Sequence, residues 1–268
     1  MYDAFDFVMT EHAAWLPSGG GRQRVLVAAD GGHWLVTARG HTLTLDALNN
    51  CTAEPVCDIF TLPKGLSTVS ELTTTLRRLG SVVRFRNTDL WDAVGTAIIR
   101  QVIRAGQSTK LYRAFCGAYG ERVALPNGGR YALFPTPAVV LGLSDEQFDS
   151  IGMAFKRRPL RAAAEACLEQ GAKWRELAPD ALAAELQTVP RIGPWTAHAA
   201  VADWSNDWAL YPYADLAVRT WARRAAPGYD WPDDEPTFGR IWRDLAGEHL
   251  CSQTLLTLAW GSQHGAIG

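Results

Sequence analysis

The sequence predicts an α+β fold, in which a small N-terminal antiparallel β-sheet domain (residues 1–80) precedes an all-helical body (residues 81–268). Two observations support this prediction. Short runs rich in Val, Leu and Thr, separated by turn residues, fill the segment from Arg24 to about Leu62. After Pro63 the apolar residues recur at intervals of three and four, which is helical spacing.

Composition and charge exclude several classes of protein. The chain has 268 residues, 47% of them hydrophobic and 20% charged, which is ordinary for a globular protein and excludes collagen-like and wholly disordered chains. Its 26 Lys and Arg residues are balanced by 28 Asp and Glu residues, so any site for nucleic acid must be local. Five cysteines without a CxxC pair indicate reduced thiols. No apolar run reaches about 18 residues, so a cytoplasmic protein without a membrane partner is expected.

The N-terminal strands are predicted from three β-forming runs separated by turn signals. These runs read RVLVAA, HWLVTA and TLTL, with Asp30-Gly31-Gly32 and Arg39-Gly40 between them, and they predict an antiparallel hairpin or meander. The glycines of the preceding segment, Pro17 to Gly21, could suggest a phosphate-binding loop. Because no Lys and no helical run follow them, a flexible turn is favoured.

The helical body is predicted to begin at Asp89, which can cap a long apolar run. Gly106 interrupts this run, so it forms two helices or one broken helix. Further helices are expected over 144–152, 158–170, 179–188, 194–204, 216–225, 237–246 and 252–261.

A tight turn between two of these helices is the first candidate site. One helix ends at Gln187, the turn runs from Val189 to Gly193, and the next helix starts at Pro194, whose missing N–H is not needed there. In such a helix-hairpin-helix the backbone amides at the turn can bind a DNA phosphate without basic side chains. A plain αα-hairpin is equally consistent with the turn alone.

The second candidate is a single carboxylate. Asp215 lies 20 residues beyond Trp195, after a loop rich in Tyr and Pro and directly before a helix (215 − 195 = 20). This position is that of a good N-cap, and it also suits a catalytic acid; the two roles are compatible.

Together, the hairpin, its proline and the later Asp resemble the helix-hairpin-helix DNA glycosylase superfamily, and most closely its AlkA-type branch, the 3-methyladenine DNA glycosylase II proteins. Residues 96–123 resemble the family's helix pair that carries a DNA wedge, and residues 134–169 resemble its middle helices. The matches run in the family's order from about Asp89 to Trp260, roughly two thirds of the chain.

The resemblance implies a monofunctional DNA N-glycosylase of base excision repair. Such an enzyme binds double-stranded DNA as a monomer, flips out a damaged base, here an alkylated purine, and hydrolyses its N-glycosidic bond without lyase activity. The catalytic carboxylate falls on Asp215, which would stabilise an oxocarbenium-like sugar and orient water. Trp195 stands where bifunctional members have a nucleophilic Lys. Only Cys251 follows Asp215, so no iron-sulfur cluster is expected.

The resemblance also assigns binding roles. The base pocket would contain Trp195, Trp260, Tyr213 and Ala199. The DNA-binding residues would be Val102 as the wedge, Gln101, Arg191, Ile192, Gly193 and Thr196. Catalysis needs no cofactor, but a structural monovalent cation, Na⁺ or K⁺, would be held by the backbone carbonyls of Gln187, Val189 and Ile192.

Two residues depart from the family pattern. Arg191 replaces the first hairpin glycine, and Ala199 replaces a pocket Tyr that stacks on the extruded base, which weakens cation–π recognition of charged alkylpurines. Two alternatives stay open. One, which Ala199 favours, is a non-catalytic DNA-binding or damage-sensing protein on the same scaffold. The other, which the near-neutral charge allows, is a glycosylase that acts on free nucleosides or a nucleotide metabolite.

Overall fold

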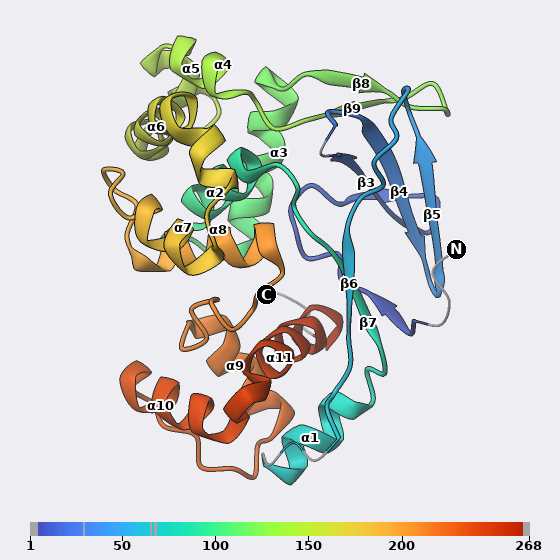
Figure 1. The fold of residues 1–268 in the computed structure, drawn as a ribbon, viewed down its shortest axis with the longest axis vertical. Helices are drawn as coiled ribbons and strands as arrows, with labels where there is room; N and C mark the ends of the chain where they lie inside the picture. The colour runs from blue at the N-terminus through green and yellow to red at the C-terminus, as the bar shows by residue number, and fades with distance from the viewer. Residues whose placement is uncertain (1–4, 29, 65, 67–68, 265–268) are drawn as a thin grey trace.

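The computed structural model describes residues 5–28, 30–64, 66 and 69–264. Strands gather on one side of the molecule and most helices on the other (Figure 1). The expected α+β fold is confirmed. No helix in the described part of the chain is long and apolar enough to cross a membrane.

A four-stranded antiparallel sheet forms the outer side of the molecule. Its order is β2–β3–β4–β5, with bounds Leu16–Ser18, Gly21–Val27, His33–Arg39 and Thr42–Ala47. The predicted meander is therefore confirmed, and Gly19 and Gly20 of the glycine-rich segment form the turn between β2 and β3. In a second sheet, β7 (Val82–Phe85) pairs in parallel with β1 (Phe7–Val8) and antiparallel with β6 (Cys57–Phe60). Since β7 lies after residue 80, strands from both sides of the expected domain boundary share this sheet.

The prediction of an all-helical body is wrong at two places, the first of which is β7 at its start. A hairpin of β8 (Arg122–Ala124) and β9 (Arg130–Ala132) interrupts the helices. Its Tyr131, with the nearby Leu125, packs in a small core against Val25 of β3. Strands of three residues are too short to show alternation, although the Asn127-Gly128 turn between them is a hairpin signal.

The helices otherwise follow the predicted order. The long apolar run forms two helices, and Asp89 caps the first by accepting a hydrogen bond from the amide of Trp91 (3.0 Å). Two short helices lie outside the expected ranges, α1 in the N-terminal region and α4 directly before the helix expected over 144–152. The bounds are α1 Ser70–Arg77, α2 Leu90–Arg100, α3 Ala105–Tyr119, α4 Pro137–Gly142, α5 Asp145–Ser150, α6 Arg157–Arg175, α7 Pro179–Leu186, α8 Pro194–Ser205, α9 Leu216–Ala225, α10 Glu235–Ala246 and α11 Leu250–His264.

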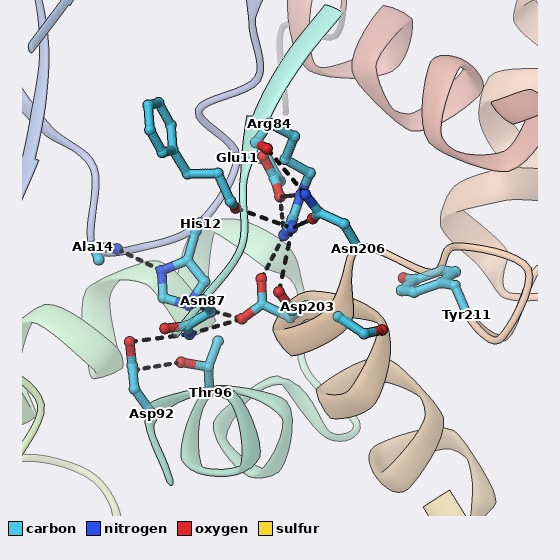
Figure 2. A network of polar contacts seen from close by, with 12 residues as sticks. Glu11, His12, Ala14, Arg84, Asn87, Asp92, Thr96, Asp203, Asn206 and Tyr211 are labelled. Atoms are coloured by element: carbon cyan, nitrogen blue, oxygen red, sulfur yellow. Dashed lines mark hydrogen bonds and ion pairs between the residues drawn. The ribbon is translucent and has the colours of Figure 1, made fainter. Parts of the chain in front are cut away.

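A buried ionic network joins the sheets to the helices (Figure 2). Arg84 of β7 forms ion pairs with Asp203 near the end of α8 and with Glu11 (2.9 Å). Asn87 donates a hydrogen bond to the carboxylate of Asp203 (2.8 Å). Burial lowers the pKa of Arg84, but the carboxylates of Glu11 and Asp203 outweigh it and raise the pKa above its usual value. The network therefore fixes α8, which follows the predicted hairpin, against β7.

Candidate functional site

The turn between α2 and α3 presents a strained and exposed apolar side chain. Val102 has a φ of 61° and is 101% exposed, whereas a β-branched residue normally avoids both conditions. The buried Lys156 supports this turn, since its Nζ donates to the carbonyls of Ile98 (2.9 Å) and Gln101 (2.7 Å). Burial lowers the pKa of Lys156 to about 8. The ring centre of the exposed Phe155 lies 5.0 Å from the same Nζ.

The predicted hairpin is the connection between α7 and α8. Its turn is closed by the amide of Ile192, which donates to the carbonyl of Val189 (3.1 Å), and both side chains are buried. Arg191 has a φ of 69°, so it takes the left-handed backbone that glycine would take without strain. Gly193 then caps α8, and Pro194 follows in its first turn. The first amides of α8 therefore lie at a helix N-terminus, where a phosphate binds favourably.

One side chain joins the two turns. The Nε2 of Gln101 donates to the Oγ1 of Thr196 (2.7 Å) and to the carbonyl of Arg191 (3.3 Å). The structure thus brings together the residues expected to bind DNA, namely Gln101, Val102, Arg191, Ile192, Gly193 and Thr196.

Asp215 is the N-cap of α9 and is partly buried. Its Oδ1 accepts a hydrogen bond from the amide of Leu216 (2.7 Å), and its Oδ2 accepts one from the hydroxyl of Tyr211 (3.1 Å). Both carboxylate oxygens therefore have fixed directions. The loop before Asp215 is also tied to α8, because the Nδ1 of His198 lies 3.0 Å from the carbonyl of Leu210.

Arg100 connects Asp215 to Trp195. It is the last residue of α2, and its Nη2 donates to the hydroxyl of Tyr211 (3.2 Å). Its guanidinium carbon also lies over the indole of Trp195, 5.6 Å from the ring centre. Burial lowers the pKa of Arg100, but Tyr211 and Asp215 outweigh this effect, so the net shift is upward. Burial raises the pKa of Tyr211 to about 12. Arg100 therefore stays positively charged at neutral pH, beside the neutral phenol of Tyr211 and the carboxylate of Asp215.

Three residues assigned to the base pocket lie outside this chain of contacts. The hydroxyl of Tyr213 accepts a hydrogen bond from the Nε of Arg243 in α10 (2.7 Å). Trp260 stacks on His264 and lines a separate cavity of about 320 Å³, whose other walls come from α1, α9 and α11. Ala199 is 3% exposed and belongs to the core. Of the four expected pocket residues, only Trp195 is joined by the contacts described above to Asp215.

The sequence did not predict the contacts that Arg100, Tyr211 and Lys156 make in the structure. In the sequence, Arg100 looks like an arginine that faces solvent or a phosphate. Its partner Tyr211 is 111 residues away, so no local pattern shows their contact. The signals available in the sequence were Gln101, which directly follows Arg100, and the Tyr-rich loop that contains Tyr211.

Three carbonyl groups of the hairpin are the expected ligands of the cation. The carbonyl of Val189 accepts a hydrogen bond from the amide of Ile192. The carbonyls of Gln187 and Ile192 accept no backbone hydrogen bond recorded within the described residues. Neutral oxygens with free lone pairs suit an alkali cation. No cluster of three or more His, Cys, Asp or Glu that could hold a metal occurs within the described ranges.

Comparisons with known proteins show a likeness of fold. No protein-family model and no curated protein matches the sequence. A 3-methyladenine DNA-glycosylase from Archaeoglobus fulgidus superposes with a TM-score of 0.68 at 17% identity, covering 95% of this chain and 91% of that one. An 8-oxoguanine glycosylase/lyase from Clostridium acetobutylicum, in complex with double-stranded DNA, gives 0.69 at 14% identity, with 94% and 89% covered. A DNA-3-methyladenine glycosidase from Bacillus halodurans gives 0.53 at 17%, with 77% and 94% covered.

Proposed function

We propose that this chain, which has the fold of the helix-hairpin-helix DNA glycosylases, is itself a monofunctional DNA N-glycosylase that acts on a damaged base flipped out of double-stranded DNA. The observation that carries the proposal is the fixed carboxylate of Asp215, which is linked to Trp195 through Tyr211 and Arg100. The strained, exposed Val102 of the same chain supplies the expected wedge. Alkylated purines are the substrates that the sequence resemblance implies.

In the proposed mechanism the hairpin anchors the DNA. The backbone amides at the start of α8 bind a phosphate, and Val102 enters the duplex where the damaged nucleotide leaves the stack. The flipped base then occupies the space beside Trp195, while Asp215 faces its sugar. As the glycosidic bond breaks, the carboxylate stabilises the positive charge that develops on the sugar and orients the attacking water. Hydrogen bonds from Leu216 and Tyr211 hold the carboxylate in place.

Trp195 supports a mechanism without strand cleavage. A lyase reaction needs an amine that attacks the sugar, and an indole has no such nucleophile. The buried Lys156 donates to two backbone carbonyls of the wedge turn. We therefore propose that the product is an abasic site in an intact strand.

A monovalent cation is part of the proposal as a structural element. The carbonyls of Gln187, Val189 and Ile192 would hold it, and the cation would add positive charge at the turn that binds phosphate. Catalysis itself needs no cofactor in this proposal.

One observation favours a second candidate, a non-catalytic DNA-binding protein. Both oxygens of Asp215 already accept hydrogen bonds, as expected of a purely structural helix cap. A binding protein would use the hairpin and Val102 in the same way but would release no base.

Both candidates can be tested with a panel of duplexes, each containing one lesion among N3- and N7-alkylpurines, hypoxanthine, 8-oxoguanine and uracil. The proposed enzyme converts at least one lesion to a site that breaks only after alkali treatment. It should also form no adduct with the DNA under borohydride. A trapped adduct would contradict the monofunctional assignment, and binding without any base release would favour the second candidate.

A further inference from the structure

Arg100 lies in the part of the site that the proposed function gives to the flipped base. Its guanidinium lies over Trp195, which the resemblance assigns to the base pocket, and donates to Tyr211, which holds the carboxylate of Asp215. Arg100 is at the end of α2, directly before Gln101 and the wedge turn. A base that stacks beside Trp195 therefore meets this guanidinium.

The guanidinium has unused hydrogen-bonding capacity. Arginine carries five N–H donors and no acceptor. Within the described residues, one recorded hydrogen bond uses these donors, the bond to Tyr211. The remaining N–H groups can donate to an acceptor on a ligand, and a carbonyl oxygen of a nucleobase is such an acceptor.

The surroundings of Trp195 favour this cation over a second aromatic ring. Ala199, one helical turn after Trp195 in α8, ends in a methyl group and is 3% exposed. No other aromatic ring is recorded packing against Trp195 in the described ranges, whereas Arg100 does lie over it. The indole thus faces a positive charge, which opposes the binding of a positively charged base by cation–π attraction.

We propose that Arg100 determines substrate specificity, by selecting neutral nucleobases that carry a carbonyl acceptor and excluding cationic N-alkylpurines. This inference rests on the proposed glycosylase function and narrows its substrate class. Hypoxanthine, uracil and 8-oxoguanine are neutral and offer carbonyl oxygens. An N7-methylguanine or N3-methyladenine nucleotide carries a positive charge, which is repelled by a guanidinium at a partly buried site.

The test compares two changes at Arg100 on the same lesion panel. Arg100→Gln keeps hydrogen-bond donors and removes the charge, whereas Arg100→Lys keeps the charge. We expect the wild-type protein to excise neutral lesions faster than cationic ones. Arg100→Gln should raise the ratio of cationic to neutral excision by about tenfold or more. The reason is that it removes the repulsion of cationic bases, and a small change in interaction free energy changes the ratio tenfold. Arg100→Lys should leave this ratio within about threefold of the wild-type value.

Tyr211→Phe is the matched control, since it breaks the link to Asp215 but retains the charge of Arg100. Tyr211→Phe should slow the excision of all lesions alike and leave the ratio of cationic to neutral excision unchanged. If Arg100 had only a structural role, Arg100→Gln would give the same result. Thermal unfolding of each variant checks that it folds. Excision that prefers cationic lesions, or a ratio that Arg100→Gln does not change, overturns the inference and leaves the glycosylase proposal intact. If the wild-type protein excises no lesion, the proposed function itself fails.

Discussion

Asp203→Asn is expected to destabilise the protein strongly, because it removes the charge at the centre of the buried ionic network. The side chain of Asp203 is 10% exposed and that of Arg84 is 3% exposed. Without this carboxylate, Arg84 keeps only one recorded carboxylate partner, Glu11. Breaking one partner of a buried pair typically costs about 3 to 5 kcal/mol. We expect a loss near the lower end, about 3 kcal/mol, because Glu11 still offsets part of the charge.

The pH dependence of this loss gives a second readout. Burial raises the pKa of Asp203, but His12, Arg84 and Arg24 outweigh it, so the folded-state pKa lies below the usual value of 3.8. A lowered carboxyl pKa stabilises the folded state above the unfolded pKa and loses this effect as the pH falls. The difference between wild type and Asp203→Asn should therefore be constant above about pH 5 and shrink towards pH 3.

Urea unfolding followed by circular dichroism measures both effects. The matched control is Asp233→Asn, because Asp233 also pairs with an arginine, Arg223 (3.1 Å), but its side chain is 104% exposed. The control should change the free energy of unfolding by less than about 1 kcal/mol, as exposed ion pairs do. If Asp203→Asn costs no more than Asp233→Asn, the network does not hold α8 in the way described.

Three further predictions concern strain, phosphate contact and ionisation. Val102→Gly should raise the free energy of unfolding by about 1 kcal/mol, since glycine accepts the positive φ, and should slow excision from duplex DNA by loss of the wedge; equal activity would deny Val102 that role. Arg191→Gly should also stabilise by about 1 kcal/mol and should reduce the slope of log affinity against log salt by about 0.9, or by nothing if Arg191 does not contact phosphate. Burial raises the pKa of Asp92 to about 7, although Arg24 opposes the shift. This carboxyl therefore stabilises the fold at low pH and loses that effect as the pH rises towards 7. Between pH 5 and pH 8, the stability of Asp92→Asn measured in urea should improve relative to wild type by about 2 to 3 kcal/mol; a constant difference would contradict the raised pKa.

Local signals were sufficient to predict much of the fold. The helix over 216–225 has the same bounds in the structure, and Asp89 caps its helix as expected, because caps and apolar spacing act within one or two turns of chain. The short β8–β9 hairpin was missed because three-residue strands show no periodicity. Likewise, the parallel pairing of β1 with β7 joins segments about 75 residues apart, so no local pattern shows it.

The candidate site was predictable where it depends on the hairpin and less so where it depends on side-chain packing. Gln101 and Thr196 are 95 residues apart and meet in the structure, and the resemblance had assigned both to DNA binding. By contrast, the direction taken by Arg100 depends on space and partners that only the folded chain provides. The same holds for Tyr213 and Trp260, whose aromatic character suited a pocket but whose recorded contacts lie elsewhere.

Release of a free base by wild type and by Asp215→Asn tests most directly whether this carboxylate is catalytic. Single-turnover reactions would use a lesion duplex that the wild-type protein excises, with free base quantified by mass spectrometry and DNA binding measured in parallel. Asp234→Asn is the matched control, because Asp234 likewise caps a helix, α10, through a hydrogen bond from Thr237 (2.9 Å). We expect Asp215→Asn to bind the duplex but to release base at least about 100-fold more slowly, and Asp234→Asn to match wild type. Full base release by Asp215→Asn would contradict a catalytic role for this carboxylate.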